Sequence, residues 1–298
     1  MNPHWVTGFS DGEASFSINI SKANDHSLGW KISPSFSIGL HSKDLAILKE
    51  IQIFFNGAGS IYHLDDSKVF YRIKSLTDLI KYVIPHFDKY PLLTQKRADF
   101  LLFKQAVDLM SRKEHLTNKG FLDIVSIKAS LNWGLPENLK NAFPNIVPKV
   151  RPAIELKSIQ DPHWIAGFAD GESCFFVEKS VSNTYKSGYQ TRLKFIFSQD
   201  SRDKALLNLL KDYLNCGNVI TDSRGMSRLI IRKHSDIISF IIPFFANYPL
   251  HSVKNMDYLD FCKASKIIKN KAHLTEEGLK QIDQIRSGMN KGRFSSLK

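Results

Sequence analysis

The chain has 298 residues, a length that favours about two domains, each large enough for a core of its own. With 43% hydrophobic residues it is globular rather than disordered, and no apolar run in the sequence reaches membrane-spanning length, so we expect a soluble protein. The formal net charge of +12 favours a polyanionic partner, of which nucleic acid is the commonest.

The three cysteines, Cys174, Cys216 and Cys262, form no CxxC pair and are odd in number. This argues against a disulfide framework or a zinc ribbon and indicates reduced thiols. The first residues lack the basic segment of a secretory signal and the Arg-rich character of an import presequence, so we expect neither.

The first predicted element is a helix over residues 3–14, within the stretch HWVTGFSDGEASF. Residues 16–21 then alternate between apolar and polar. The same alternation over 30–41 is typical of a half-buried antiparallel strand, with Trp30, Phe36 and Leu40 on the apolar side. Further along we expect a helix over 43–55, a hairpin over 61–64 and 68–74, and helices over 78–87, 94–111 and 117–131.

The second half repeats this order. HWIAGFADGESCF starts at His163, a shift of 159 from His4, and KEHLTNKG at 113–120 returns as KAHLTEEG at 271–278, a shift of 158. Two copies of one domain, joined by duplication and fusion, explain the repeat. We place the domains at 1–140 and 161–298. The linker, 141–160, belongs to the stretch 141–162, which holds four of the eleven prolines.

The expected fold is therefore α+β, with two antiparallel sheets that each have one face covered by helices. The other face carries Lys, Arg, Ser, Asn and Gln. Such a face is either simply exposed to solvent or a saddle for nucleic acid, and the basic charge makes the saddle at least as plausible.

Each repeated helix contains Gly-x-x-x-Gly, formed by Gly8 and Gly12 and by Gly167 and Gly171. Glycines one turn apart let another helix approach closely, and such packing would offset their cost of roughly 1 kcal/mol each. We expect the two helices to pack against each other, and a dimer-like interface without further function is the alternative.

Two acids close each of these helices, Asp11 and Glu13 in the first copy and Asp170 and Glu172 in the second. If the helices meet, their carboxylates converge at ends where the helix dipole already disfavours negative charge, so the cluster requires cations. Mg²⁺ suits carboxylate and carbonyl oxygens. A basic protein with such a site suggests metal-assisted phosphodiester hydrolysis, with two near-equivalent sites for two strands.

These stretches also resemble the LAGLIDADG motif, with Glu in place of its second Asp. Copy one adds HFDKYPLLTQK and LNWGL, and copy two adds YPL and MNKG. Over nearly its whole length the chain resembles a single-chain LAGLIDADG homing endonuclease of the kind carried in fungal mitochondrial introns. The resemblance implies two pseudo-symmetric αββαββα domains with saddle-shaped sheets and a shared two-helix interface.

The resemblance also implies site residues. Glu13 and Glu172 match the metal-ligating acids, and the carbonyls of Gly12 and Gly171 would complete the coordination. Asp11 and Asp170 match the motif's first acid, for which we expect helix capping or interface hydrogen bonds rather than direct catalysis. Peripheral catalytic candidates are Lys74, Gln199 and Arg232, and Leu40 stands where copy two has Gln199. Each candidate could equally be an ordinary phosphate or solvent contact.

The outward strand faces are the expected DNA-reading surfaces. Arg and Lys suit guanine edges, and Asn and Gln suit adenine. The candidates in copy one are Ser17, Asn19, Lys31, Ser33, Ser35, Ser37, Lys68 and Arg72; those in copy two are Glu178, Lys179, Gln190, Arg192, Lys194, Arg228, Arg232 and Lys233. Because the copies differ at these positions, the target should be asymmetric, and two domains span roughly 20 base pairs.

By resemblance, the expected function is a Mg²⁺-dependent, monomeric, mitochondrial endonuclease that cuts both strands and leaves short 3′ overhangs. Mn²⁺ should substitute, and Ca²⁺ should bind without cleavage. An RNA-binding maturase that acts on its host intron, or a DNA-binding protein without activity, are alternatives that do not need both glutamates. A two-carboxylate sugar hydrolase fits the charge poorly.

The repeated histidines have simpler interpretations. His4 and His163 precede the acid helices, and packing is the expected role, with metal binding as the alternative. His115 and His273 should precede helices whose N-caps are Thr117 and Thr275.

Overall fold

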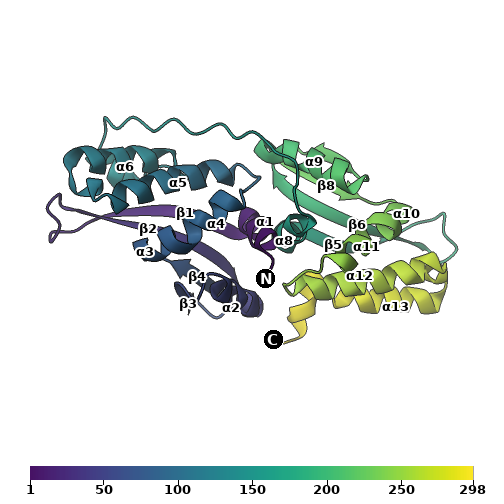
Figure 1. Cartoon of the computed structure of the whole chain (residues 1–298). Coiled ribbons are helices and arrows are strands. Elements are labelled where there is room, and N and C mark those ends of the chain that lie inside the picture. Colours follow the sequence, from purple (N-terminus) through teal and green to yellow (C-terminus); the bar gives the residue numbers. More distant parts are fainter. Residues whose placement is uncertain (298) are drawn as a thin grey trace. The chain divides into compact units, whose positions relative to one another are not determined.

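The computed structural model describes residues 1–297, which divide into a compact unit 1, Met1–Lys157, and a compact unit 2 from Ser158 onward (Figure 1). Among these residues no helix combines the length and the apolar character that a membrane crossing requires.

Both units follow the order predicted from the repeat. Unit 1 consists of α1 (Pro3–Glu13), β1 (Ala14–Lys22), β2 (Trp30–His41), α2 (Leu45–Phe54), β3 (Ser60–His63), β4 (Lys68–Ile73), α3 (Leu76–Asp78), α4 (Ile84–Lys89), α5 (Lys96–Ser111), α6 (Asn118–Ser130) and α7 (Glu137–Ala142). Unit 2 consists of α8 (Pro162–Glu172), β5 (Ser173–Val181), β6 (Tyr189–Asp200), α9 (Lys204–Leu214), β7 (Asn218–Thr221), β8 (Met226–Ile231), α10 (His234–Asp236), α11 (Ile242–Asn247), α12 (Lys254–Lys269) and α13 (Glu276–Ser287).

Each unit has one four-stranded antiparallel sheet, in the order β1-β2-β4-β3 or β5-β6-β8-β7. The predicted alternation over 30–41 is confirmed, because Phe36 and Ile38 are fully buried while Ser35 and Ser37 lie on the other face. In unit 1 the rings of Phe16 and Phe100 contact each other, which attaches α5 to the covered face of the sheet. The opposite face of each sheet is here called its open face.

One predicted helix is interrupted in both copies. Residues 78–87 were expected to form a single helix, but Leu79–Val83 forms a wider π-helical turn before α4. Pro85 explains this, because it cannot donate a backbone hydrogen bond and its ring clashes with the carbonyl one turn before. Unit 2 has the same turn over Ile237–Ile241, ahead of Pro243.

The repeated HLT motif is a helix start, as predicted. Thr117 Oγ1 accepts a hydrogen bond from Gly120 N at 3.1 Å, and Thr275 does the same for Gly278 at 3.1 Å. A Cβ at Gly120 would lie 2.2 Å from the carbonyl oxygen of Glu114, so this turn accepts only glycine.

The proline-rich stretch has neither helix nor strand from 143 to 161, but its first part is attached to unit 1. Arg151 extends Nη1 to 2.7 Å and Nη2 to 2.9 Å from the carboxylate of Asp99 in α5. In unit 2 the matching Asp257 is bound by Arg293, with Nη2 2.8 Å from Oδ1. These arginines are not at equivalent positions, because one precedes the second copy and the other follows its last helix.

The repeated asparagines complete this arrangement. Asn132 and Asn290 have left-handed backbones, with φ of 52° and 54°. Asn132 N donates to Asp99 Oδ1 at 3.1 Å, while its Nδ2 donates to the carbonyl of Phe16 at 2.7 Å. Asn290 makes the same two bonds in unit 2, to Asp257 and Phe175. The LNWGL and MNKG motifs therefore fasten the chain just after α6 and α13 to α5 or α12 and to the first strand of the same unit.

Candidate active site

The acid helices α1 and α8 are positioned by hydrogen bonds at their N-termini. Asn2 Oδ1 accepts from His4 N at 2.8 Å, and Asp161 Oδ1 accepts from His163 N at 2.8 Å, with proline as the first residue of each helix. The rings of His4 and His163 pack edge-on against Tyr90 and Tyr248, as the packing interpretation predicted.

The first acid of each motif is buried and bonded to the backbone. Asp11 is 3% exposed and accepts from Leu93 N at 2.9 Å, Thr94 N at 3.0 Å and Thr94 Oγ1 at 2.6 Å. Asp170 repeats this with His251 and Ser252. Burial raises the pKa of both carboxyl groups, and these hydrogen bonds oppose the rise. These bonds are made to the loop before α5 or α12 of the same unit, rather than to a helix cap or to the interface that was expected.

A lysine closes the C-terminal end of each acid helix. Lys96, the first residue of α5, places Nζ 3.0 Å from the carbonyl of Ser10 and 2.9 Å from that of Gly12. Lys254 places Nζ 2.9 Å from the carbonyl of Ala169 and 3.1 Å from that of Gly171. A cation here is favoured because the carbonyls of the last helical turn carry the negative end of the helix dipole.

Glu13 and Glu172 are the last residues of α1 and α8, and both are half-buried. Each directly follows a glycine whose carbonyl already accepts from a lysine; a carbonyl has two lone pairs, so it can accept once more. Within residues 1–297 no group of three or more His, Cys, Asp or Glu side chains could hold a metal alone. One carboxylate with one carbonyl fits Mg²⁺ or Ca²⁺, which complete their shells with water and substrate phosphates.

The open face of unit 1 is rich in small polar residues. The register aligns Ser15 with Ser37, Ser17 with Ser35, and Asn19 with Ser33 across β1 and β2. Ser17 and Ser35 share a hydrogen bond of 2.9 Å. The remaining candidates from copy one, Lys31, Lys68 and Arg72, also lie on this face by strand alternation.

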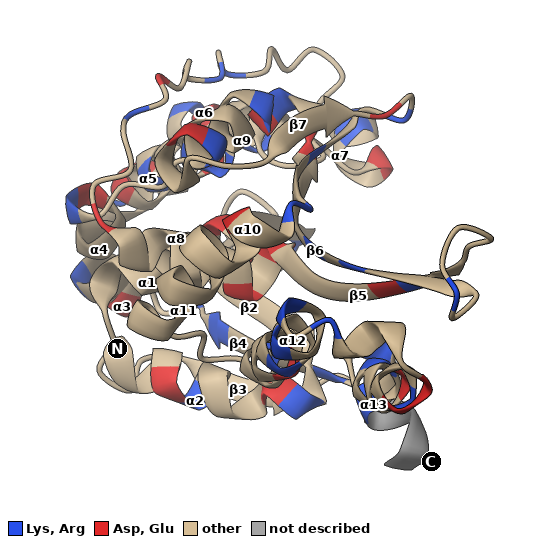
Figure 2. Ribbon diagram, turned by 90° about the vertical axis from the view of Figure 1, so that its right-hand side faces the viewer, with Lys and Arg blue, Asp and Glu red and all other residues tan. Residues whose placement is uncertain are grey.

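The open face of unit 2 is more strongly charged. Lys194 Nζ lies 2.6 Å from Glu178 Oε1, and Arg228 Nη1 lies 2.9 Å from Asp222 Oδ2. Figure 2 shows an acidic residue on β5 and basic residues on the neighbouring strand β6. Gln190 and Arg192 share the face by alternation, and Gln190 Nε2 donates to Tyr185 Oη at 3.2 Å.

One candidate lies on the wrong side of its sheet. Lys179 was expected on the open face, but it pairs with the buried Thr191 and points to the covered side. There its Nζ lies 2.6 Å from Asp283 in α13 and 4.1 Å from the ring centre of Tyr189. Adjacent strand residues point to opposite faces, so Glu178 and Lys179 could not both face outward.

The peripheral catalytic candidates lie at strand ends. Lys74 and Arg232 are exposed and follow the last residues of β4 and β8. Gln199 pairs with the buried Ser227 and is half-buried near the end of β6. The lysines that contact the carbonyls just before the glutamates are instead Lys96 and Lys254, to which the sequence assigned no role. The available signal was their recurrence in the two copies, shortly after the repeated Tyr-Pro-Leu.

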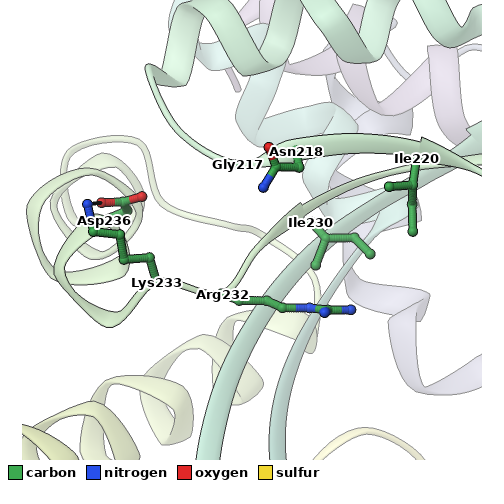
Figure 3. A pocket seen from close by; sticks show the side chains of 7 residues that line it. All are labelled: Gly217, Asn218, Ile220, Ile230, Arg232, Lys233 and Asp236. Carbon is green, nitrogen blue, oxygen red and sulfur yellow. Dashed lines mark ion pairs between the residues drawn. The ribbon is translucent and has the colours of Figure 1, made fainter.

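A hollow of about 550 Å³ contains Arg232 and Lys233, between the start of β7 and the end of β8 (Figure 3). Asn218, Ile220, Ile230 and Asp236 complete most of its lining. Lys233 Nζ lies 3.4 Å from Asp236 Oδ1, whereas Arg232 extends along the hollow beside Ile230 (Figure 3). The hollow is therefore a basic part of the open face of unit 2.

Comparisons with known proteins agree with this geometry. The family model of the LAGLIDADG endonucleases matches residues 6–107 and 165–265. "Probable intron-encoded endonuclease 2" of Neurospora crassa is 40% identical over 301 residues, covering 97% of this chain and 65% of that protein. "Probable intron-encoded endonuclease 3" of the same fungus is 41% identical over 289 residues, covering 96% of this chain. The chain spans 65% and 54% of the lengths of these two relatives.

Solved structures match over the whole fold. The I-SmaMI LAGLIDADG homing endonuclease bound to cleaved DNA is 44% identical, with a TM-score of 0.97 over 98% of both chains. The same protein bound to uncleaved DNA with calcium ions gives a TM-score of 0.96. I-GzeII in complex with its DNA target is 39% identical, with a TM-score of 0.92 over 98% of this chain and 99% of that one.

Proposed function

Since this chain belongs to the LAGLIDADG endonuclease family, we propose that it is a site-specific homing endonuclease that cuts both strands of DNA. The observation that carries the proposal is the repeated end of the acid helix. In each unit a glutamate follows a glycine carbonyl that a lysine contacts, at 2.9 Å in unit 1 and 3.1 Å in unit 2. An inactive DNA-binding protein or a splicing helper has no need of two such sites.

The glutamates and the glycine carbonyls have defined roles in this proposal. Glu13 with Gly12 and Glu172 with Gly171 would hold divalent cations, Mg²⁺ in the cell. When bound there, such an ion would supply the acidity that activates a water molecule and the positive charge that stabilises a leaving oxygen. Mn²⁺ should replace Mg²⁺, and the relative solved on uncleaved DNA with calcium suggests that Ca²⁺ supports binding without cleavage.

The lysines and the first acids support this site. Lys96 and Lys254 fix the carbonyls at the helix ends and add a positive charge where a phosphate would sit. Asp11 and Asp170 anchor the helices to the loops before α5 and α12, and thereby hold the glutamates in position. Lys74 and Arg232 follow the ends of β4 and β8 with the parity of the open faces and would contact the DNA backbone. Gln199 has the parity of the covered face of its sheet, so a backbone contact is not proposed for it.

DNA would lie against the open face of each unit. The net charge of +12 favours this binding. A single chain would cover an asymmetric site of roughly 20 base pairs and leave short 3′ overhangs. The fungal, intron-encoded relatives suggest a mitochondrial protein that acts at the insertion site of its own intron.

The test is selection of cleaved sites from a DNA pool that includes candidate intron-insertion sequences. We expect one long asymmetric site to be cut in Mg²⁺, to be bound uncut in Ca²⁺, and to be bound uncut by the double variant Glu13→Gln/Glu172→Gln. If the unmodified protein binds DNA tightly but does not cleave it, the endonuclease proposal is wrong and a DNA-binding regulator is favoured. Binding to the host intron RNA alone would leave the maturase.

A further inference from the structure

Each open face carries one arginine on the strand that pairs with the long strand, β4 in unit 1 and β8 in unit 2. The two arginines occupy different positions along these strands. Arg72 of β4 pairs with Ser37, and Arg228 of β8 pairs with Ser198. Since Ser37 corresponds to Ile196 in the repeat, the place of Arg72 is taken in unit 2 by Ile230. The two arginines are therefore displaced by two residues along matching strands.

Arg72 is held by aromatic rings. Its guanidinium carbon lies 5.2 Å from the ring centre of Tyr62 and 5.8 Å from that of Phe70, and these two rings stack on each other. Its Nε is buried without a hydrogen-bond partner among the described residues. Burying this donor without an acceptor costs free energy. The contacts of the guanidinium with the two rings offset that cost and hold the side chain in place.

Arg228 is held by a carboxylate that the neighbouring turn fixes. Asp222 Oδ1 accepts from the backbone N of Arg224 and of Met226, each at 3.0 Å. The other oxygen, Oδ2, lies 2.9 Å from Arg228 Nη1. The two side chains are 35% and 31% exposed, so this ion pair adds little to stability and its main effect is orientation.

Unit 1 has no such pair at the matching place. Leu64 stands at the position of Asp222 and is 62% exposed, while Phe70 stands at the position of Arg228. The turn acid of unit 1, Asp65, instead accepts from Ser67 N at 2.8 Å and Ser67 Oγ at 2.7 Å. The two faces thus present one oriented arginine each, fixed by different chemistry.

We propose that Arg72 and Arg228 each recognise a guanine, one in each half of the DNA site, and that Asp222 is a positioning residue that orients Arg228. The inference rests on the proposed function. The open edge of a fixed guanidinium matches the O6 and N7 acceptors of guanine in the major groove, which admits β-strands. Fixing the side chain in advance reduces the entropy lost on binding.

The displacement predicts where the guanines lie. Two residues along an antiparallel strand are about 7 Å, or roughly two base-pair steps. Tyr71 of β4 and Leu229 of β8 lie level with Ala14 and Ser173, the residues that follow Glu13 and Glu172, and β4 and β8 run in the same direction as β1 and β5, away from the acid helices. Arg228 comes one residue before this level, whereas Arg72 comes one residue after it. The guanine read by Arg228 should therefore lie roughly two base pairs nearer the cleaved bonds than that read by Arg72.

The experiment is a binding profile of the full chain in Ca²⁺ against a library randomised one position at a time, with cleavage measured separately in Mg²⁺. The main variant is Asp222→Asn, which keeps Oδ1 for the turn and replaces the oxygen that faces Arg228. We expect the preference for guanine at one position to fall about tenfold, with the other positions unchanged. Arg228→Ala should remove that preference. The double variant Asp222→Asn/Arg228→Ala should have the same binding profile as Arg228→Ala alone.

Two variants are controls for this result. Asp65→Asn changes the turn acid of unit 1, which contacts no arginine, and should leave the profile unchanged. Arg72→Ala should affect one position in the other half of the site. A uniform loss of affinity in Asp222→Asn, or guanine preference that survives Arg228→Ala, overturns the inference even if cleavage depends on the glutamates. The predicted profile without any cleavage would instead overturn the proposed function alone.

Discussion

Lys96 Nζ lies 2.9 Å from the carbonyl oxygen of Gly12, the residue immediately before Glu13. The lysine and the glutamate come from segments more than 80 positions apart, because Lys96 begins α5 while Glu13 ends α1. Asp11 fixes this relationship by accepting bonds from Leu93 and Thr94, just ahead of the lysine. The lysine is therefore delivered to the helix end by the same loop that anchors the helix.

Replacing Lys96 with methionine should slow cleavage of one strand by roughly 10²-fold while DNA binding in Ca²⁺ changes little. The methionine keeps most of the volume but removes the charge at the carbonyls of Ser10 and Gly12. Strand-specific end labelling would show accumulation of nicked DNA, and Lys254→Met should slow the other strand. The control is Lys104→Met on the same helix, which removes only an exposed pair with Asp88.

Asp11→Asn should lower the free energy of unfolding by about 2 kcal/mol, because the amide can accept fewer of the three bonds from Leu93 and Thr94 and leaves donors unsatisfied. Asp170→Asn should have a similar effect through His251 and Ser252. Urea titration measures both. Stability unchanged within error in both variants would contradict the anchoring role.

His86 makes unit 1 sensitive to acid. It is 7% exposed, its Nε2 lies 3.1 Å from Thr7 Oγ1, and burial lowers its pKa to about 3. Because the folded-state pKa lies below the unfolded value of 6.5, the stabilisation is complete above pH 6.5 and is lost as the pH falls toward 3. At pH 5 the loss should be about 2 kcal/mol.

The matching position in unit 2 supplies the test variant. Phe244 stands where unit 1 has His86, and Ala166 stands where it has Thr7. The variant Thr7→Ala/His86→Phe should remove most of the stability loss between pH 6.5 and pH 4.5, measured by urea unfolding at each pH. The single variant Thr7→Ala should retain the loss. An acid response that survives in the double variant would assign it to other groups.

Arg151→Met should lower the stability of unit 1 by about 1–3 kcal/mol, because it leaves the carboxylate of Asp99, only 10% exposed, without its cation. Arg293→Met should do the same in unit 2 by releasing Asp257. Hydrogen exchange resolved to α5 and α12 separates the two effects. The exposed pair of Lys140 with Glu137 provides the control, and its loss should cost less.

The strands of both units followed from the alternation of apolar and polar residues, since half-buried sheets impose that period directly. The π-helical turns did not, because a proline inside an apolar helix is compatible with several distortions of the turn before it. The side on which Lys179 lies could not be predicted from residue type, because the adjacent Glu178 and Lys179 are both charged but point to opposite faces of the sheet. Lys96 escaped assignment because its role depends on a loop that returns to α1, and no local pattern reports such a contact.

Arg151 also has a consequence for where the first copy ends. The stretch between the two copies supplies the arginine that completes unit 1, whereas unit 2 takes its arginine from beyond its own last helix. The first copy is therefore whole only when it includes part of what looks like a tether. A fragment that ends at residue 140 would lack Arg151, whereas one that ends at residue 157 would contain it. Any attempt to split, permute or recombine the two halves should therefore cut after residue 157.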